Sequence, residues 1–321
     1  MSSQEIITIP PDPEDQSALI NHLRLKQRRW SHIPALRRII SLIRRGASVA
    51  EPTSSIHIHR VSSSSNPDEK ESITVISANL CHDWPFYRRQ TARLEAFANL
   101  VEKVKADIIL LQEVSRTSIL NVDSWLVDRL GMSSIYSRAN GSSKIGFEEG
   151  LAVLSRFPLS RPRLTHLRPA VTPVVRRLAL GAQAFTPAGP LWVFSVHLGL
   201  NQRQNFAQQA NLRSMVTALP VDQLALLGGD FNSDESTPQI RENRRVWIDT
   251  FRYLHPESDA TTHAIHLPGG GSFLRRRLDY IFLRSSLPGW EIKETGHLHT
   301  GRLPHSDHQV VYARLVPIGS G

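Results

Sequence analysis

The chain is almost devoid of cysteine, since Cys81 is the only one among its 321 residues. An internal disulfide is therefore impossible, and a cysteine-rich zinc site is excluded as well. A metal ion bound by this chain would have to be held by oxygen and imidazole ligands. Long apolar runs are also missing, because no stretch approaches the roughly 20 residues that a membrane-spanning helix needs.

The start of the chain, MSSQEIITIPPDPEDQ, lacks the basic and apolar segments of a secretory signal. We therefore expect an intracellular, cytoplasmic protein. Positive charge is in excess, with 38 Lys and Arg against 29 Asp and Glu and a formal net charge of +9. A basic surface favours polyanions such as nucleic acid, anionic lipid headgroups or phosphorylated small molecules. An ordinary basic soluble protein is an equally good explanation of this charge.

Residues 1 to 71 are predicted to be an N-terminal extension. Residues 1 to 18 are polar and proline-rich, which predicts disorder. Residues 47 to 71 are rich in serine and proline and predict a linker. Within that linker IHIHRV (56–61) alternates between apolar and polar residues, as an additional strand would.

A basic amphipathic helix is predicted over about residues 28 to 46. The surrounding segment 20–46 carries eight Lys and Arg and no acid, with apolar and basic side chains on different helical faces. Such a helix is typical of contact with an anionic membrane surface. Packing of its apolar face on the main domain is the simpler explanation, and contact with the phosphates of nucleic acid is a third.

From residue 72 to 321 the pattern becomes regular and predicts one catalytic domain. Apolar runs that predict strands lie at 72–80, 107–114, 150–159, 176–186, 191–200, 224–232, 277–283 and 308–316, and helical spacing lies at 86–106 and 204–219. Several strands follow one another with no helix between them, so a purely parallel sheet is excluded. We predict an α+β fold in which two packed, mixed, largely antiparallel sheets are flanked by helices.

Acids, amides and imidazoles stand at the ends of most of these strands. They are Asn79, Glu113, His197, Asp230, Asn232, Asp279, Asp307 and His308. A carboxylate at the edge of a core loses solvation, and an unpaired one would shift its pKa or destabilise the fold. We therefore expect these groups to meet in one cleft. A divalent cation would neutralise Glu113, Asp230 and Asp307, and oxygen ligands suit Mg²⁺ or Mn²⁺.

Taken singly, these residues also have structural explanations. Asp279 could be the ion-pair partner of Arg276 or Arg277, and His197 could be a satisfied core histidine. Gly228 and Gly229, just before Asp230, are interpreted as a tight turn beside the cluster.

The motifs SANL, LLQEV, SVHLG, GGDFN, RLDY and SDH, in this order, resemble the endonuclease/exonuclease/phosphatase superfamily with its deoxyribonuclease-I-like fold. The resemblance covers roughly residues 72 to 317. It implies a four-layer α/β/β/α sandwich and metal-assisted hydrolysis of a phosphoester. It also implies that Glu113 is the principal metal ligand, that Asn79 lies beside metal and phosphate, and that Asp307 completes the acidic cluster.

The same resemblance implies the catalytic roles. His308 would contact or activate the attacking side, with its ring fixed by Asp279. Asp230 would orient or deprotonate water, and Asn232 would bind the phosphoryl oxygens. His197 would act on the phosphate as a hydrogen-bond donor or general acid.

The predicted activity is a divalent-metal-dependent phosphodiesterase that acts on nucleic acid like an endonuclease. The histidine of SVHLG argues against an abasic-site endonuclease and is shared by deoxyribonuclease-like and sphingomyelinase-like enzymes. The basic loop GGGSFLRRR (269–277) suits a nucleic-acid backbone and a lipid headgroup equally. A phospholipid or sphingomyelin headgroup hydrolase docked through residues 28–46, a phosphatase of a small metabolite, and a non-catalytic binding module are the alternatives. No obligate protein partner is predicted.

Overall fold

The computed structural model describes residues 2–9, 54–61, 72–172, 175–266, 272–284, 290–301 and 303–318. The predicted basic helix at 28–46 lies outside these residues, as does most of the predicted linker. None of the helices in the described part of the chain is long and apolar enough to cross a membrane.

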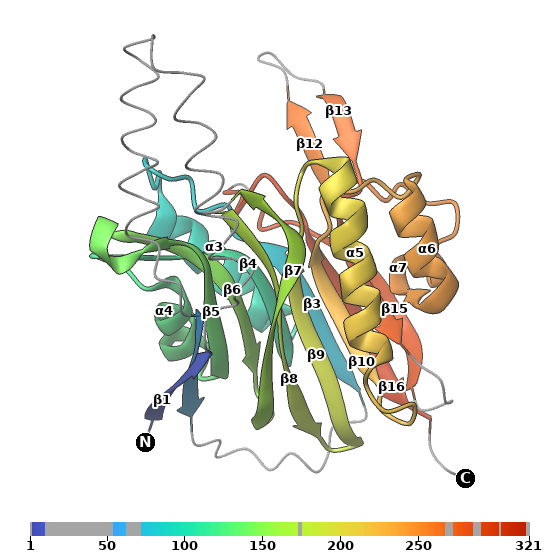
Figure 1. The fold of residues 1–321 in the computed structure, drawn as a ribbon, viewed down its shortest axis with the longest axis horizontal. Helices are drawn as coiled ribbons and strands as arrows, with labels where there is room; N and C mark the ends of the chain where they lie inside the picture. The colour runs from blue at the N-terminus through green and yellow to red at the C-terminus, as the bar shows by residue number, and fades with distance from the viewer. Residues whose placement is uncertain are drawn as a thin grey trace.

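Two mixed sheets and a separate hairpin make up the strands (Figure 1). The larger sheet has the order β1 (Ser2–Ile9), β2 (Ser54–Val61), β5 (Ser133–Ser142), β6 (Phe147–Ser155), β4 (Ile108–Thr117), β3 (Ile73–Asn79), β16 (Val310–Pro317) and β15 (Trp290–Leu298). The smaller sheet has the order β11 (Ile248–Asp249), β14 (Asp279–Arg284), β10 (Ala225–Asp230), β9 (Gly189–His197), β8 (Val175–Thr186) and β7 (Leu159–Thr172). The hairpin consists of β12 (His263–His266) and β13 (Ser272–Arg276).

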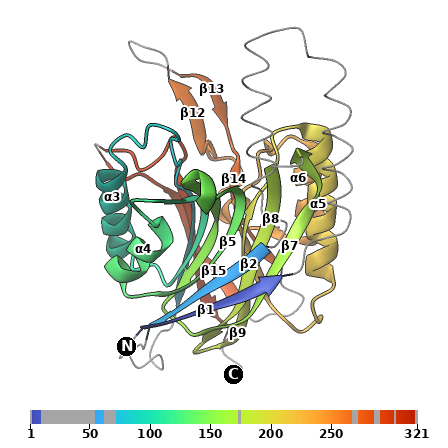
Figure 2. The ribbon, with the colours of Figure 1, turned by 60° about the vertical axis from the view of Figure 1, so that its left-hand side comes forward.

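Helices cover the outer face of each sheet. They are α3 (Gln90–Lys103), α4 (Val122–Leu130), α5 (Gln202–Thr217), α6 (Pro238–Val246) and α7 (Thr250–Leu254), with a 3-10 turn at Ser143–Ile145. Figure 2 shows α3 and α4 on one side, α5 and α6 on the other, and the sheets between them. The predicted α+β fold and its four-layer α/β/β/α arrangement are therefore confirmed.

Three apolar cores hold these layers together. The central core lies between the sheets and joins Leu110 of β4 to Leu180 and Leu226 of the smaller sheet. The outer cores place Phe97 of α3 against the larger sheet and Leu212 of α5 against the smaller one. Because central strands are covered on both faces, β3 and β10 are buried along their whole length.

The predicted disorder of residues 1 to 18 is wrong for Ser2–Ile9. These residues form β1, which pairs antiparallel with β2, so that Ile7 lies opposite Ile56. The isoleucines and threonine of QEIITI have high strand propensity, and the predicted strand at 56–61 is present as β2 and supplies the backbone partner. The pairing brings together positions about fifty residues apart, which no local pattern reveals.

The topology brings the polar strand ends to one edge. Among the described strands only β3–β4 and β9–β10 are parallel pairs, so the carboxyl ends of each pair meet. Asp230 lies opposite His197 on one side and opposite Asp279, the first residue of β14, on the other. A bulge in β4 between Leu111 and Val114 frees the intervening residues from their partner strand.

The two glycines before Asp230 do not form the predicted turn. Both lie within β10, and neither has a positive φ. A Cβ atom on Gly228 would lie 2.6 Å from Leu110 Cδ1 of the facing sheet, and one on Gly229 would overlap the carbonyl oxygen of Val196. The glycines are therefore required for close packing of β10, both against its neighbour and across the sandwich.

Candidate active site

One amide joins the two sheets at the site. Asn79 Nδ2 donates to Glu113 Oε1 at 3.1 Å and to Asp230 Oδ2 at 3.2 Å. Asn79 ends β3 and Glu113 lies in the bulge of β4, both in the larger sheet, whereas Asp230 ends β10 of the smaller sheet. The predicted convergence of these three side chains is present in the structure.

Two imidazoles lie around the same Asp230 oxygen. His197 Nε2 lies 3.6 Å from Asp230 Oδ2, and His308 Nε2 lies 3.9 Å from it. The other nitrogen of His308 lies 2.9 Å from Asp279 Oδ2. All four side chains are almost completely buried, so their charges interact with little screening by water.

Burial and neighbouring charges give the two histidines of the site different protonation states at neutral pH. Burial raises the pKa of Asp230 to about 7, although the charge of His308 works against this. Burial alone would lower the pKa of His308, but the carboxylates of Asp279 and Asp230 outweigh it and raise that pKa to about 10. Burial lowers the pKa of His197 well below its usual range, and the nearby cation of Arg177 adds to the effect. At neutral pH His308 is therefore an imidazolium and His197 a neutral ring.

Two of the site residues, Glu113 and Asn232, have a left-handed backbone conformation. Glu113 has φ of 54° within the β4 bulge, and Asn232 has φ of 48° just after β10. Non-glycine residues rarely adopt this conformation, and such strain is concentrated at functional sites. Asn232 is fixed further, because its N–H donates to Asp230 Oδ1 and its Nδ2 donates to Leu198 O, both at 2.9 Å. A side-chain amide has two N–H donors, so one remains for a ligand.

Glu149 is a site residue that the sequence reasoning missed. Its Oε1 lies 3.8 Å from His197 Nδ1, and its Oε2 accepts from Asn140 Nδ2 at 2.5 Å. Burial raises the pKa of Glu149, and the charge of Glu113 adds to the effect. The signal was an acid at the edge of the apolar run GLAVLS, the same signal that identified the other residues.

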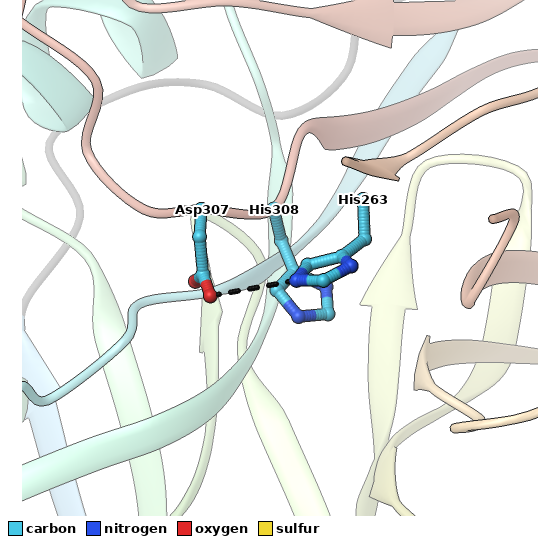
Figure 3. Close-up of side chains that lie close together, drawn as sticks. All are labelled: His263, Asp307 and His308. Atoms are coloured by element: carbon cyan, nitrogen blue, oxygen red, sulfur yellow. Dashed lines mark ion pairs between the residues drawn. The ribbon is translucent and has the colours of Figure 1, made fainter. Parts of the chain in front are cut away.

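Asp307 takes a different position from the other acids. Its Oδ2 lies 3.6 Å from His263 Nε2 (Figure 3), and its side chain is 57% exposed, whereas that of Asp279 is 2% exposed. His263, which no motif identified, lies in β12 with its ring centroid 4.7 Å from that of His308. Of the predicted cluster of Glu113, Asp230 and Asp307, the structure brings Glu113 and Asp230 together through Asn79. Asp307 instead contacts His263.

The donor set near Glu113 fits a hard divalent cation. Glu113 is partly exposed, and its carboxylate lies beside the carboxylate of Asp230 and the amide of Asn79. Carboxylate and amide oxygens are the ligands that Mg²⁺ and Mn²⁺ prefer. Two other groups of side chains could also hold a metal ion, and both include His308: one with His263 and Asp307, the other with Asp230 and Asp279. In either group the imidazolium of His308 would have to lose its proton before it could bind a metal. The oxygen ligands near Glu113 therefore fit a cation better.

A cleft opens beside His308, with a volume of about 780 Å³. Its lining includes Asp83 and Arg88 from the segment after β3, Arg93 from α3, and Thr261 and Arg275 from the region of the β12–β13 hairpin. The cleft therefore joins the buried cluster to a surface that carries several arginines.

Acids, amides and imidazoles gathered at one end of paired sheets, in a four-layer sandwich, define a phosphoester hydrolase. The chain belongs to the Endonuclease/Exonuclease/phosphatase family, whose profile matches residues 76–308 and so includes every residue of the cluster. Members of this family hydrolyse phosphoesters and generally use divalent metal ions.

Individual relatives agree with this assignment. The Escherichia coli K12 protein named "Uncharacterized protein YbhP" is 30% identical over 181 residues, which cover 52% of this chain and 70% of that protein. A family protein from Leptotrichia buccalis has a similar structure, with a TM-score of 0.63, 19% identity, and coverage of 76% of this chain and 99% of its own. D. rerio TDP2 in complex with a single-strand DNA product gives a TM-score of 0.62 at 16% identity, with coverage of 77% and 99%. The likeness to these two structures shows the shared fold.

Proposed function

We propose that the protein is a divalent-metal-dependent phosphodiesterase that acts on nucleic acid. The observation that carries the proposal is the position of Asp230 between His197 and His308, with Glu113 on the same amide. A phosphodiester is an anion, so its hydrolysis requires positive charge and hydrogen-bond donors at its oxygens and a base for the attacking water.

The protonation states assign the roles of the residues. The imidazolium of His308 donates to a phosphoryl oxygen and stabilises the negative charge that develops there. Asp230, with a pKa of about 7, accepts the proton of the attacking water, since a base is most effective when its pKa lies near the working pH. Neutral His197 and the free N–H of Asn232 are hydrogen-bond donors to the phosphate. The lowered pKa of His197 favours this role over that of general acid.

A divalent cation bound by Glu113 and Asn79 would cancel phosphate charge and stabilise the leaving oxygen. The chain's own contribution is to hold the two ligands rigidly. Asn79 Oδ1 accepts from Cys81 N at 2.9 Å, and Glu113 Oε2 accepts from His82 N at 3.3 Å. These bonds orient the oxygens before a ligand arrives.

Charge supports nucleic acid as the substrate. The chain has a net charge of +9, and arginines line the cleft beside His308. A polyanion is attracted to such a surface. The structural neighbour solved with a single-strand DNA product has the same fold. Hydrolysis of a lipid headgroup, with docking through residues 28–46, stays a prediction, because that segment lies outside the described residues.

The test is hydrolysis by the purified chain of bis(p-nitrophenyl) phosphate and of a labelled oligonucleotide, each with Mg²⁺ and with EDTA. We expect cleavage of both substrates that EDTA abolishes, and a loss of at least about 10²-fold in Glu113→Ala and in His308→Ala. Sphingomyelin vesicles and p-nitrophenyl phosphate test the lipid and monoester alternatives. Hydrolysis that is unchanged by EDTA, or a preference for sphingomyelin or p-nitrophenyl phosphate, would contradict the proposal.

A further inference from the structure

An exposed pair of aromatic rings lies in the segment that follows β3. Trp84 is 55% exposed and Phe86 is 71% exposed, and both belong to the stretch CHDWPFYRR (81–89). Large apolar side chains that are exposed together are unfavourable for a protein in water unless they bind something. The catalytic roles assigned above do not use either ring.

Hydrogen bonds hold this segment in one shape. The carboxylate of Asp83 accepts the backbone N–H of Arg88 at 2.9 Å and two guanidinium bonds at 2.9 and 3.0 Å. The carbonyl oxygen of Asp83 accepts the N–H groups of Phe86 and Tyr87, both at 2.8 Å. The two exposed rings are thus presented by a braced turn, which lowers the entropy cost of binding a ligand.

Contacts of the rings themselves leave surface for a ligand. The Trp84 ring lies 5.6 Å from the ring of Phe147, and the guanidinium of Arg88 lies 5.4 Å from the centroid of Phe86. Each ring is therefore positioned by a neighbour, yet more than half of each residue's surface is open to solvent. A flat, rigid and partly covered ring is suited to stacking against another flat group.

The segment is attached directly to the cluster of site residues. The backbone N–H of Cys81 donates to Asn79 Oδ1, and that of His82 donates to Glu113 Oε2. The backbone N–H of Trp84 donates to His82 Nδ1 at 2.9 Å. A phosphate bound at Asn79 and Glu113 would consequently have the aromatic segment as its neighbour. A polymeric substrate that extends from this phosphate along the segment would meet Trp84 and Phe86.

We propose that Trp84 and Phe86 are a stacking platform for unpaired bases of single-stranded nucleic acid beside the scissile phosphate. This inference rests on the proposed function and specifies the substrate class. Bases in a duplex hide their faces in the stack, whereas bases in a single strand expose them to aromatic side chains. Arg88, Arg93 and Arg275 line the adjoining cleft together with the carboxylates of Asp83 and Asp307, which leaves these side chains with an excess of one positive charge for the phosphates.

The test compares the binding of a fluorescein-labelled dT8 with that of an eight-residue abasic oligonucleotide of the same charge, by anisotropy in EDTA. We expect the full-length wild type to bind dT8 more tightly, because only dT8 has bases to stack. Trp84→Ala and Phe86→Ala should each weaken dT8 binding by at least about 5-fold and leave abasic binding unchanged. Tyr253→Ala is the matched control, since Tyr253 is 61% exposed on α7, away from this segment, and should change neither.

Three outcomes would overturn the platform: equal binding of the two oligonucleotides by the wild type, no measurable dT8 binding, or full dT8 affinity in both variants. Loss of sedimentation with phosphatidylcholine/phosphatidylglycerol vesicles in the variants, with dT8 binding intact, would overturn it in favour of a membrane contact. Hydrolysis of dT8 with Mg²⁺ is measured separately. Base-dependent binding without any hydrolysis would contradict the proposed function, whereas hydrolysis without base-dependent binding would contradict the platform alone.

Discussion

His308 Nδ1 lies 2.9 Å from Asp279 Oδ2, although 29 positions separate the two residues. Asp279 opens a strand of the smaller sheet, and His308 precedes the last strand of the larger one. The bond therefore crosses between the sheets. It fixes the ring so that Nε2 faces the cluster, and it favours the protonated imidazole.

Replacement of Asp279 by asparagine tests this relationship. The variant keeps the shape of the side chain and removes its charge, so the pKa of His308 should fall and turnover should drop by about 10²-fold or more. KM should change much less, because Asp279 acts through His308. Asp222→Asn, at an exposed position, is the control. Steady-state kinetics and NMR titration of His308 are the measurements, and an unchanged His308 titration would contradict the account.

The pH dependence of stability follows from the same pair. The pKa of His308 is about 10 in the folded chain and about 6.5 in the unfolded one. Because the folded pKa is the higher, the stability from protonated His308 is fully present below pH 6.5 and is lost as the pH rises through 10. The difference in free energy of unfolding between wild type and His308→Gln should therefore shrink between pH 6.5 and 10. Urea unfolding in EDTA measures it, and a difference that stays constant would refute the assigned charge state.

The packing of β10 gives a prediction about stability alone. Gly229→Ala would drive its methyl group into the backbone of Val196, which has no room to move, so we expect a loss of about 2–3 kcal/mol. Gly228→Ala meets the flexible end of Leu110 first and should cost less. Chemical denaturation of the two variants gives the comparison. Equal stability of Gly229→Ala and wild type would contradict the close packing of β10 against Val196.

Much of the site could be predicted because its residues stand where apolar runs end. Asn79 and Asp230 are the last residues of their strands. Glu113 lies at the end of the apolar run of β4, and His308 precedes the last strand. An acid in such a place has few structural explanations other than a shared cleft. The two-sheet class was also accessible, because consecutive strands without intervening helices exclude a parallel sheet.

Residues whose role depends on distant pairing could not be predicted in this way. His263 meets Asp307 only because β12 runs beside the segment that carries His308, through an isolated bridge between His263 and His308. Strand β1 likewise depends on β2, and the two glycines of β10 depend on the facing strands. These contacts are set by tertiary packing, so the local sequence carries no signal for them.

The central claim is that Glu113 and Asn79, both of the larger sheet, hold a divalent cation beside Asp230 of the smaller sheet. The most direct measurement is an anomalous difference map from crystals of the protein soaked in Mn²⁺, with Glu113→Gln crystals as the control. The account predicts a peak in contact with the Glu113 carboxylate, lost in the variant. A peak between His263 and Asp307, or a peak that survives in Glu113→Gln, would contradict it.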